Sequence, residues 1–408
     1  MSHPKILVVV TKYPSPQHPY IIRLMAALKQ TYPGLQLFMF RPGDKQAGIA
    51  QVGKEDIETV LTDALMRGQP KARPGILLNF IGNCLRNPRQ AIATYKRARS
   101  QNLSTAQAIG QVFYHHELFG KQFDMVYFNA VQIAYHFDIP FYFPDTRILI
   151  SCRGDDFDLN PTKYNKPLLT ADHVHVLGSY LRSQVIDRGI EDKNITTIPP
   201  AFLPKWPSRE NFVYSSNTLK ITIAARLNWT KGHRYLLDAI DILKKSLNDT
   251  RVELHIMGIG EAEEELRYRV FELGLDKEVT FHGWVAEKEV IEMVRDSFVY
   301  CLPSLVEGYN NSVVTAQSLG VPCIVARSGG LSENVIHEKT GFVVSPASGE
   351  EIAQSILSLW EDKDLYQNMC TNAIERVKEL DFSIHIRRYN QMFDEVLSTD
   401  FNKGKEQD

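Results

Sequence analysis

Two segments in the second half of the sequence carry charged residues that could hold a phosphorylated ligand. Arg226 and Lys231 lie five positions apart after one apolar run, and Glu307 follows another apolar run that ends at Leu302. Arginine offers a planar pair of donors and lysine a compact charge, so together they could bind a diphosphate and stabilise it as a leaving group. Taken alone, an arginine and a lysine at this spacing are more often an ordinary surface pair.

Helix-capping residues and glycines follow this acidic position. Asn311 and Ser312 stand before a short apolar helix expected over 313–319, and Gly329 and Gly330 follow the next apolar run. Strand, short helix, strand and glycine turn are typical of a parallel sheet built around a phosphate, because helix N-termini and bare glycine amides favour anions. We therefore expect amides near Asn311, Ser312, Gly329 and Gly330 to approach phosphate or sugar.

Short apolar strands alternate with helix-length segments along the whole chain, which indicates βαβ units and parallel sheets covered on both faces. In the first half we expect strands over 6–10, 36–39, 125–127, 148–152, 173–176 and 196–198. In the second half we expect strands over 221–224, 253–257, 279–282, 299–302, 323–325 and 341–344. The chain then turns helical, and a last helix over about 382–397 carries one apolar stripe.

The length of 408 residues fits two domains of about 200 residues each. Four prolines within 199–207 interrupt the alternation and predict a linker, because proline continues neither a strand ladder nor a helix interior. The sequence thus predicts two doubly wound α/β domains with the ligand between them, outside the carboxyl ends of the strands. We expect a first domain over 1–200, a linker over 201–218 and a second domain over 219–381. A last helix with a polar tail is expected over 382–408.

Composition excludes several other classes of protein. A net charge of −2 gives no indication of a nucleic-acid partner. The five cysteines are odd in number and lack close pairs, so buried thiols are favoured over disulfides or zinc ligands. The N-terminus enters a strand within a few residues, and no apolar run is long enough to span a bilayer. These features predict a soluble, cytoplasmic protein.

The string from Ala224 to Gly232 and the region from Pro303 to Gly341 resemble the donor-site signatures of family-four retaining glycosyltransferases of the GT-B fold (glycosyl transferases group 1). The resemblance implies two Rossmann-like domains facing an interdomain cleft, with the last helix crossing back onto the first. It places Arg226 and Lys231 on the diphosphate of a nucleotide-sugar donor and Glu307 on hydroxyls of the donor sugar. Gly258 resembles the family's glycine turn after the second strand. No metal and no cofactor besides the donor are implied.

Thr315 departs from the family pattern at the donor site. The family carries two glutamates eight positions apart, and here the second position is Thr315. In the family this second glutamate contacts the ribose of the nucleotide, away from the reacting bond. A threonine hydroxyl can form one hydrogen bond there but cannot bridge two ribose hydroxyls. We expect a weaker or altered hold on the nucleotide rather than lost chemistry.

In the first half, the strand over 148–152 runs into Arg153, Gly154, Asp155 and Asp156. This segment resembles the family's His-Gly-x-Asp, with arginine in place of histidine, and would put Arg153 and Asp156 near the reacting carbon. The alternative is that Asp156 caps the next turn and pairs with Arg153. We reject a metal site at Asp156 and Asp158, because nothing else supports the fold that uses one. By the same resemblance, Ser179 would cap the helix after the strand over 173–176.

The segment 64–116 contains no acidic residue while it carries eight basic ones among apolar side chains. A basic amphipathic segment can lie on an anionic leaflet, gaining roughly 1 kcal/mol for each basic residue near the surface. Family members that act on lipid-linked acceptors dock in this way, which would place the protein at the inner face of the plasma membrane. The alternative is a solvated helix face with ordinary core contacts.

These features predict a retaining glycosyltransferase that moves a hexosyl-type sugar from a nucleotide-diphosphate sugar to a glycan or lipid-linked acceptor. The setting implied by the resemblance is surface polysaccharide biosynthesis. One alternative is a nucleotide-sugar epimerase of the same fold. Another is a degenerate sugar-nucleotide-binding protein without turnover, which Thr315 and Arg153 would favour.

Overall fold

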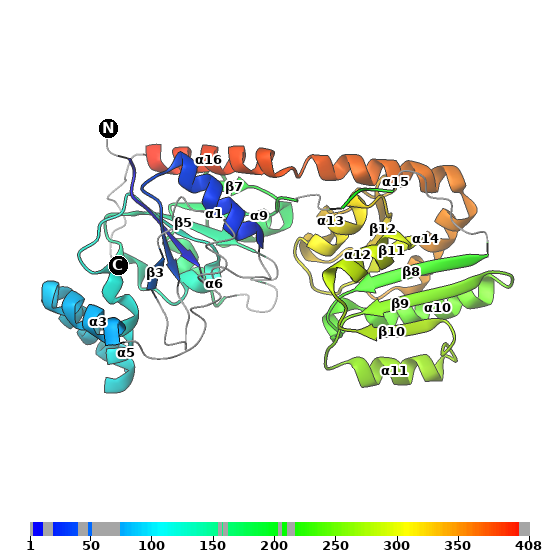
Figure 1. Ribbon diagram of the computed structural model, residues 1–408, viewed down its shortest axis with the longest axis horizontal. Helices are drawn as coiled ribbons and strands as arrows, with labels where there is room; N and C mark the ends of the chain where they lie inside the picture. The colour runs from blue at the N-terminus through cyan, green and yellow to red at the C-terminus, as the bar shows by residue number, and fades with distance from the viewer. Residues whose placement is uncertain are drawn as a thin grey trace.

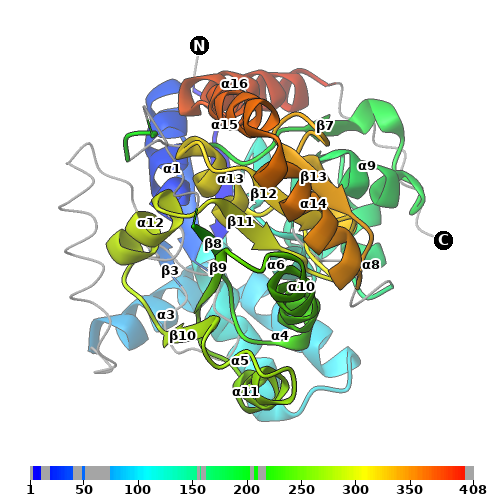
Figure 2. The same ribbon diagram turned by 90° about the vertical axis from the view of Figure 1, so that its right-hand side faces the viewer.

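The computed structural model describes residues 3–10, 19–39, 48–50, 74–153, 157, 162–202, 206–209 and 217–399. Two α/β domains lie side by side, each built around its own sheet (Figure 1). Two consecutive helices, α15 (Lys363–Lys378) and α16 (Phe382–Ser398), run along one side of the pair, α15 over the second domain and α16 over the first (Figures 1 and 2).

The sheet of the first domain has seven strands in the order β3-β2-β1-β4-β5-β6-β7. All neighbours are parallel except β2 and β3, which are antiparallel. The strands are β1 (Ile6–Val10), β2 (Gln36–Met39), β3 (Gly48–Ala50), β4 (Met125–Phe128), β5 (Arg147–Cys152), β6 (His173–Val176) and β7 (Ile195–Thr197). Sequence reasoning predicted each of them within a few residues apart from β3, which is too short to show a pattern.

Helices connect these strands and cover the sheet. The helices of the first domain are α1 (Pro19–Thr31), α3 (Pro74–Arg86), α4 (Pro88–Ser100), α5 (Thr105–His115), α6 (Val131–Ala134), α7 (Ile139–Tyr142), α8 (Asn165–Leu169) and α9 (Ser179–Ile186). Proline at the first position starts α4, where the missing N–H costs no hydrogen bond. A reciprocal capping box between Ser104 and Gln107 starts α5. Helices α3 and α5 lie on the side of the molecule opposite α16 (Figures 1 and 2).

The sheet of the second domain has six parallel strands in the order β10-β9-β8-β11-β12-β13. The strands are β8 (Thr218–Ala224), β9 (Arg251–Met257), β10 (Val279–Gly283), β11 (Val299–Leu302), β12 (Cys323–Ala326) and β13 (Gly341–Val344). The helices and short 3₁₀ turns are η3 (Trp229–Lys231), α10 (His233–Ser246), α11 (Glu263–Glu272), α12 (Glu287–Arg295), α13 (Asn311–Ser318), η4 (Gly329–Glu333) and α14 (Gly349–Glu361). Every predicted strand of this half is present.

The last helix belongs to the core of the first domain. Tyr389, Phe393 and Val396 lie one helical turn apart and are buried against β1, β4 and α1. Removing such side chains from water stabilises a protein by about 1.5–3 kcal/mol each. The predicted crossing of the last helix onto the first domain is therefore confirmed, and its apolar stripe is the cause.

The chain passes between the domains twice, and the two passages lie together. On the way out, the N–H of Phe202 donates to the carbonyl of Leu380 at 2.8 Å. On the way back, Nδ1 of His385 lies 3.1 Å from the carbonyl oxygen of Pro199. Residues 203–205 and 210–216 of the expected linker lie outside the described residues.

Candidate functional site

The loops at the carboxyl edge of the second sheet pack directly on one another. Gly232 has a φ of +73°, and a Cβ on it would lie 2.0 Å from the carbonyl oxygen of Pro303. The N–H of Leu305 donates to the carbonyl of Thr230 at 2.7 Å. Only glycine permits this approach, because any side chain at position 232 would displace the loop that follows β11. The contact brings the loops that carry Lys231 and Glu307 together.

Lys231 and Glu307 form an ion pair between Nζ and Oε2. Their side chains are only 20% and 16% exposed, so the pair is partly withdrawn from water. The ammonium group can bind phosphate oxygens, and the carboxylate can accept hydrogen bonds from hydroxyls. Two of the residues singled out from the sequence thus meet in space, and each is neutralised by the other.

Arg226 stands two residues beyond the end of β8 and is exposed. In the part of the chain that the structure describes, its guanidinium forms no ion pair or hydrogen bond. The backbone around it is fixed by the neighbouring loop, since the N–H of Leu227 donates to the carbonyl of Ile259 at 3.0 Å. Gly258 begins that neighbouring turn, and its N–H donates to the carbonyl of Gly283 at 2.8 Å. The edge therefore presents an arginine that is available to an anion.

The start of α13 is held by side chains rather than left open. Asn310 caps the helix, and its Oδ1 accepts from the N–H of Ser312 at 2.8 Å and from the hydroxyl of Ser312 at 2.6 Å. The hydroxyl of Tyr300 donates to Oγ of Ser312 at 2.8 Å. In this structure the cap accepts from the amide of Ser312, and the expectation that this amide approaches a ligand stays a prediction. The N–H of Asn311 forms no hydrogen bond within the described residues and remains available.

Asn334 fixes the backbone just before α13 and was not expected from the sequence. Its Oδ1 accepts from the N–H of Asn310 at 2.9 Å, and its Nδ2 donates to the carbonyl of Asn310 at 3.0 Å. Asn334 is 1% exposed, so both bonds are shielded from water. A single asparagine in an irregular segment carries no sequence signal for such a role.

The glycine turn after β12 packs behind Glu307. Gly329 has a φ of +50°, and a Cβ on it would lie 2.3 Å from the carbonyl oxygen of Glu307. A Cβ on Gly330 would lie 3.3 Å from the backbone nitrogen of Tyr309. In the ligand-free protein this turn therefore supports the Glu307 loop from behind.

Thr315 lies one turn into α13, so the position of the missing glutamate is on a helix. Its Oγ1 donates to the carbonyl of Asn311 at 2.9 Å. The hydroxyl hydrogen is therefore used within the helix, as is common for threonine. Only the oxygen lone pairs of Thr315 remain for a ligand.

At the carboxyl edge of the first sheet, Arg153 follows directly after β5. Its Nη2 donates to Oδ1 of Asn129 at 2.9 Å, and the hydroxyl of Tyr127 donates to the same oxygen at 3.2 Å. Asn129 was not expected from the sequence and is a partner of Arg153 in this structure. Asp156 lies outside the described residues, so its predicted role stays a prediction.

A buried polar network continues from Tyr127 under α16. The hydroxyl of Ser151 lies 2.7 Å from that of Tyr127 and 2.6 Å from Nδ1 of His175, whose Nε2 lies 3.0 Å from the carbonyl oxygen of Ile198. Burial, reinforced by the charge of Arg153, holds the pKa of His175 well below its usual range. The network therefore carries no positive charge on His175 at neutral pH.

The residue after Gly232 is a buried histidine. Burial, with a smaller contribution from the charge of Lys231, lowers the pKa of His233 to about 4. At neutral pH His233 is uncharged, so it adds no positive charge next to Lys231.

The start of α9 differs from the expectation that Ser179 caps it. The N-cap residue is Gly178, which has no side chain to offer, and Ser179 is the first helical residue. The carboxylate of Glu333 takes the place of a cap, since Oε2 accepts from the N–H of Ser179 at 2.8 Å and Oε1 from the N–H of Tyr180 at 2.7 Å. Glu333 follows β12 and Ser179 follows β6, so the carboxyl edges of the two sheets face each other and touch here.

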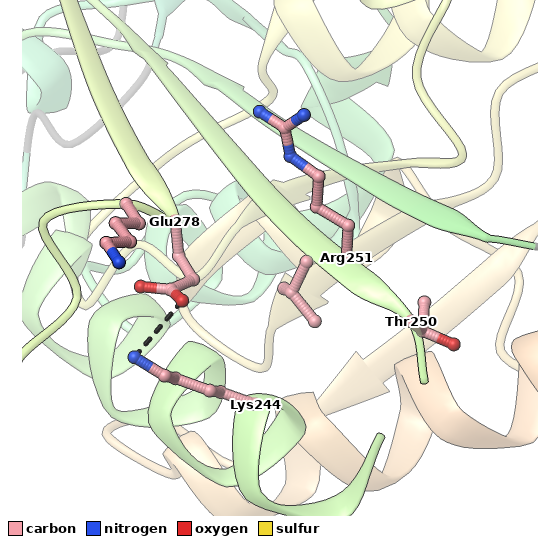
Figure 3. Close-up of a pocket in the computed structure, with 6 residues that line it drawn as sticks. Lys244, Thr250, Arg251 and Glu278 are labelled. Atoms are coloured by element: carbon pink, nitrogen blue, oxygen red, sulfur yellow. Dashed lines mark ion pairs between the residues drawn. The ribbon is translucent and has the colours of Figure 1, made fainter. Parts of the chain in front are cut away.

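A surface cavity of about 480 Å³ lies elsewhere in the second domain (Figure 3). Its lining includes Arg251 at the start of β9, and Lys244 paired with Glu278 at 3.1 Å. These residues stand at the amino ends of the strands, whereas Arg226, Lys231 and Glu307 stand beyond the carboxyl ends. The cavity is therefore not part of the candidate site.

The described residues contain neither a candidate metal site nor a helix that could span a membrane. No group of three or more histidine, cysteine, aspartate or glutamate side chains there could hold a metal ion. No helix there is long and apolar enough to cross a bilayer.

Residues 205–376 match the family described as glycosyl transferases group 1. This part of the chain is a glycosyl transferases group 1 domain. It contains Arg226, Lys231, Gly258, Glu307 and the whole of α13. The sequence resemblance to this family is therefore confirmed.

Curated relatives match a little under half of the chain. Mannosylfructose-phosphate synthase of Agrobacterium fabrum is 25% identical over 211 residues, which cover 48% of this chain and 46% of the relative. N,N'-diacetylbacillosaminyl-diphospho-undecaprenol alpha-1,3-N-acetylgalactosaminyltransferase of Campylobacter jejuni is 24% identical over 177 residues, which cover 43% of this chain and 45% of the relative. The chain thus spans about half the length of these relatives.

The similarity in three dimensions extends over the whole chain. The crystal structure of Anabaena HepE in complex with UDP superposes with a TM-score of 0.66 and 16% sequence identity, covering 96% of this chain and 100% of that chain. This likeness shows the GT-B fold. The group 1 domain is its second half, and the domain that carries Arg153 is its first.

Proposed function

We propose that this protein is a retaining glycosyltransferase that moves a hexosyl-type sugar from a nucleotide-diphosphate sugar to a glycan or lipid-linked acceptor. The observation that carries the proposal is the Lys231–Glu307 pair next to the exposed Arg226, at the carboxyl edge of a glycosyl transferases group 1 domain. Positive charge suited to a diphosphate and a carboxylate suited to sugar hydroxyls stand side by side there.

In this proposal the two cationic residues hold the donor diphosphate and stabilise it as it departs. Glu307 leaves Lys231 to accept hydrogen bonds from the donor sugar, and the N–H of Asn311 at the start of α13 donates to phosphate or sugar oxygen. HepE, which shares the fold, was crystallised with UDP and with UDP-glucose, and this supports a nucleotide-diphosphate donor. The chain would supply the positive charge through Arg226 and Lys231, with no cofactor besides the donor.

Transfer with retained configuration fits the residues at this edge. The bond between the anomeric carbon and the diphosphate oxygen breaks while a bond to the acceptor oxygen forms on the same face of the sugar. The acceptor proton passes to the departing phosphate oxygen, so the chain need not provide a strong base. Arg153, held by Asn129 at the facing edge, and Asp156 would stand near the reacting carbon.

The acceptor is proposed as a glycan or a lipid-linked glycan in surface polysaccharide assembly. The Campylobacter relative is named for an undecaprenol-linked acceptor, which supports this choice.

Exposed apolar and basic side chains on α3 and α4 also support a lipid-linked acceptor. In this surface patch Ile81, Leu85 and Ile92 are 43%, 75% and 55% exposed, and Arg89 and Lys96 are exposed as well. We propose that this patch lies on the anionic inner face of the plasma membrane, from the cytoplasmic side. Binding of the protein to vesicles of anionic lipid tests this membrane contact. Arg67, Lys71 and Arg73 of the basic segment lie outside the described residues.

A thermal-shift screen against nucleotide sugars tests the donor assignment. A ligand at 100 times its Kd that binds only the folded protein stabilises it by about 2.7 kcal/mol. Arg226→Ala should lose the shift for every nucleotide-diphosphate donor, because the exposed arginine of the diphosphate site is gone. Arg251→Ala is the control, since Arg251 is an exposed arginine of the same domain at the amino edge of the sheet.

Three outcomes would contradict the proposal. An unchanged shift in Arg226→Ala would remove the diphosphate assignment. Saturable donor binding without transfer or hydrolysis, across a panel of acceptors, would instead favour a nucleotide-sugar-binding protein without turnover. Conversion of the donor sugar to its epimer without any acceptor would identify an epimerase.

A further inference from the structure

We propose that Glu333 is a positioning residue that holds the two domains together at the reacting edge by capping α9 of the first domain. The inference rests on the proposed transferase function, because it assigns Glu333 a part in that reaction. Nothing in the sequence patterns gave Glu333 a role.

Both oxygens of Glu333 are engaged by the other domain. They accept from the N–H groups of Ser179 and Tyr180 at 2.8 and 2.7 Å, 154 and 153 residues away along the chain. These N–H groups belong to the first turn of α9, where the helix has no carbonyl partner for them and where the helix dipole favours a negative charge. A carboxylate bound by two backbone N–H groups forms charge-assisted bonds, which are stronger than neutral ones.

The first domain is shaped to receive this carboxylate. Gly178 precedes α9, and a Cβ there would lie 2.3 Å from Oε2 of Glu333. Any other residue at 178 would push the carboxylate away, and the usual caps (serine, threonine, asparagine or aspartate) would also compete for the same N–H groups. Because α9 has no side-chain cap of its own, separation of the domains would leave its first turn without a partner in the protein.

The contact leads directly from Glu333 to the candidate site. Glu333 ends the same 3₁₀ turn that begins at Gly329. A Cβ on Gly329 would lie 3.4 Å from Cε1 of Tyr180 and 2.3 Å from the carbonyl oxygen of Glu307. The turn is therefore held between α9 on one side and the backbone of Glu307 on the other.

Tyr309 extends the same contact. It packs against the core of the first domain and against Val314, Val377 and Leu380 of the second. Burial raises the pKa of its phenol to about 12. The segment that carries Glu307 thus meets the first domain both through Tyr309 and through the turn that Glu333 anchors.

This arrangement gives Glu333 a specific role in transfer. The acceptor side of the site is on the first domain and the donor side on the second, so the reacting atoms meet only when the domains are in register. The linker and α16 join the domains by the chain itself, whereas the Glu333 cap joins them at the carboxyl edges. Loss of two charge-assisted hydrogen bonds should lower the population of the closed arrangement by about tenfold or more.

Amide hydrogen exchange tests the cap without reference to activity. In the full-length protein, Glu333→Gln and Glu333→Ala should speed exchange at the amides of Ser179 and Tyr180 by about tenfold or more, because the bonds that protect them are weakened or lost. Glu361→Gln is the matched control, since Glu361 is exposed and its side chain forms no ion pair or hydrogen bond in the described part of the chain. Equal exchange in all variants would overturn the proposal.

A change on the other side of the contact removes the bond without changing any charge. Ser179→Pro deletes the N–H and puts a ring carbon where the hydrogen bond runs. Proline is well tolerated at the first helical position, and Gly178 is extended, as the residue before a proline must be. Ser179→Pro should therefore reproduce the exchange change of Glu333→Ala at Tyr180. If it does not, the carboxylate is not held by these amides.

Kinetics then separate positioning from a general loss of stability. In Glu333→Ala the stabilisation by UDP or GDP should be unchanged, because Arg226 and Lys231 remain, while kcat falls about tenfold or more. Faster amide exchange with an unchanged kcat would overturn the positioning role. If the wild-type protein transfers sugar to none of the acceptors, the proposed function is contradicted. The exchange data would still decide whether Glu333 caps α9.

Discussion

At the scale of single residues, the most consequential feature is that Lys231 and Glu307 neutralise each other in the ligand-free protein. A partly buried lysine without its partner would be costly, and so would the carboxylate. The pair keeps both groups in place, and a donor can replace it by giving phosphate to one and hydroxyls to the other.

Thr315 is one of the positions at which the chain departs from the family pattern. Its hydroxyl hydrogen is bonded within α13, so only the lone pairs of its oxygen are available to a ligand. We predict that Thr315→Glu tightens donor binding by about tenfold, because a carboxylate bonded to ribose hydroxyls contributes roughly 1.5–3 kcal/mol per charged hydrogen bond before the cost of ordering it. Isothermal titration with nucleotide sugars measures the change.

The control for this change is Ser318→Glu, which adds a carboxylate to the same helix three residues after Thr315. It should leave donor affinity as it is. Equal tightening by both variants would point to general electrostatics rather than to a ribose contact, and no tightening by Thr315→Glu would contradict the alignment of that position.

At the scale of elements, α13 is the helix whose start matters most. Asn310 caps it, and Asn334 holds Asn310 by both backbone groups. The result is a helix start with the N–H of Asn311 directed away from these bonds and available to a ligand. Local capping thus decides which backbone donor of the helix remains for an anion.

We predict that Asn310→Ala both destabilises the protein and weakens donor binding. Loss of an N-cap costs about 1 kcal/mol of unfolding free energy. Because the start of α13 would also fray, donor affinity should fall several-fold, as measured by titration together with chemical denaturation.

Ser348→Ala provides the comparison for this variant. Ser348 caps α14 by accepting from the N–H of Glu351 at 3.1 Å, on a helix that carries no proposed donor contact. It should cost a similar amount of stability with no loss of donor affinity. Similar affinity loss in both variants would mean that stability, not the geometry of α13, governs binding.

At the scale of the whole molecule, the domains are joined by the linker, by α16, by the contact between η4 and α9, and by the packing of Tyr309. The linker and α16 are covalent passages next to each other, whereas the contact between η4 and α9 lies at the facing carboxyl edges. The patch on α3 and α4 belongs to the first domain alone and lies away from α16 (Figure 2).

Vesicle binding tests whether the patch on α3 and α4 docks on an anionic membrane. Cosedimentation with vesicles containing anionic lipid should be strong at low salt and weaken as salt rises, because surface charges are screened. Arg89→Glu with Lys96→Glu should reduce binding about tenfold or more, since each basic residue contributes about 1 kcal/mol near the surface. Both residues are exposed on α4.

The comparison is Lys288→Glu with Lys363→Glu, which makes the same change in net charge on exposed lysines of the second domain. Binding should then persist. Loss of binding in both double variants would indicate attraction by net charge, and no binding by the wild-type protein would remove the membrane proposal.

The sequence by itself determined most of the fold. Strands such as β1 and β11 are fully buried, so they read as short apolar runs, and the stripe of Tyr389, Phe393 and Val396 predicted that the last helix is buried on one side. It also placed Arg226, Lys231 and Glu307 beyond the ends of parallel strands, hence at one edge of a sheet. These inferences succeed because burial pattern and strand direction depend on residues close together in the chain.

Tertiary structure alone decided which groups meet at that edge. It paired Lys231 with Glu307, let Asn310 occupy the amide of Ser312, put Asn334 behind Asn310, and gave α9 its cap from Glu333. A helix cap supplied from 154 residues away leaves no local pattern, because hydrogen bonds depend on distances in space, which only the packing of the two domains sets.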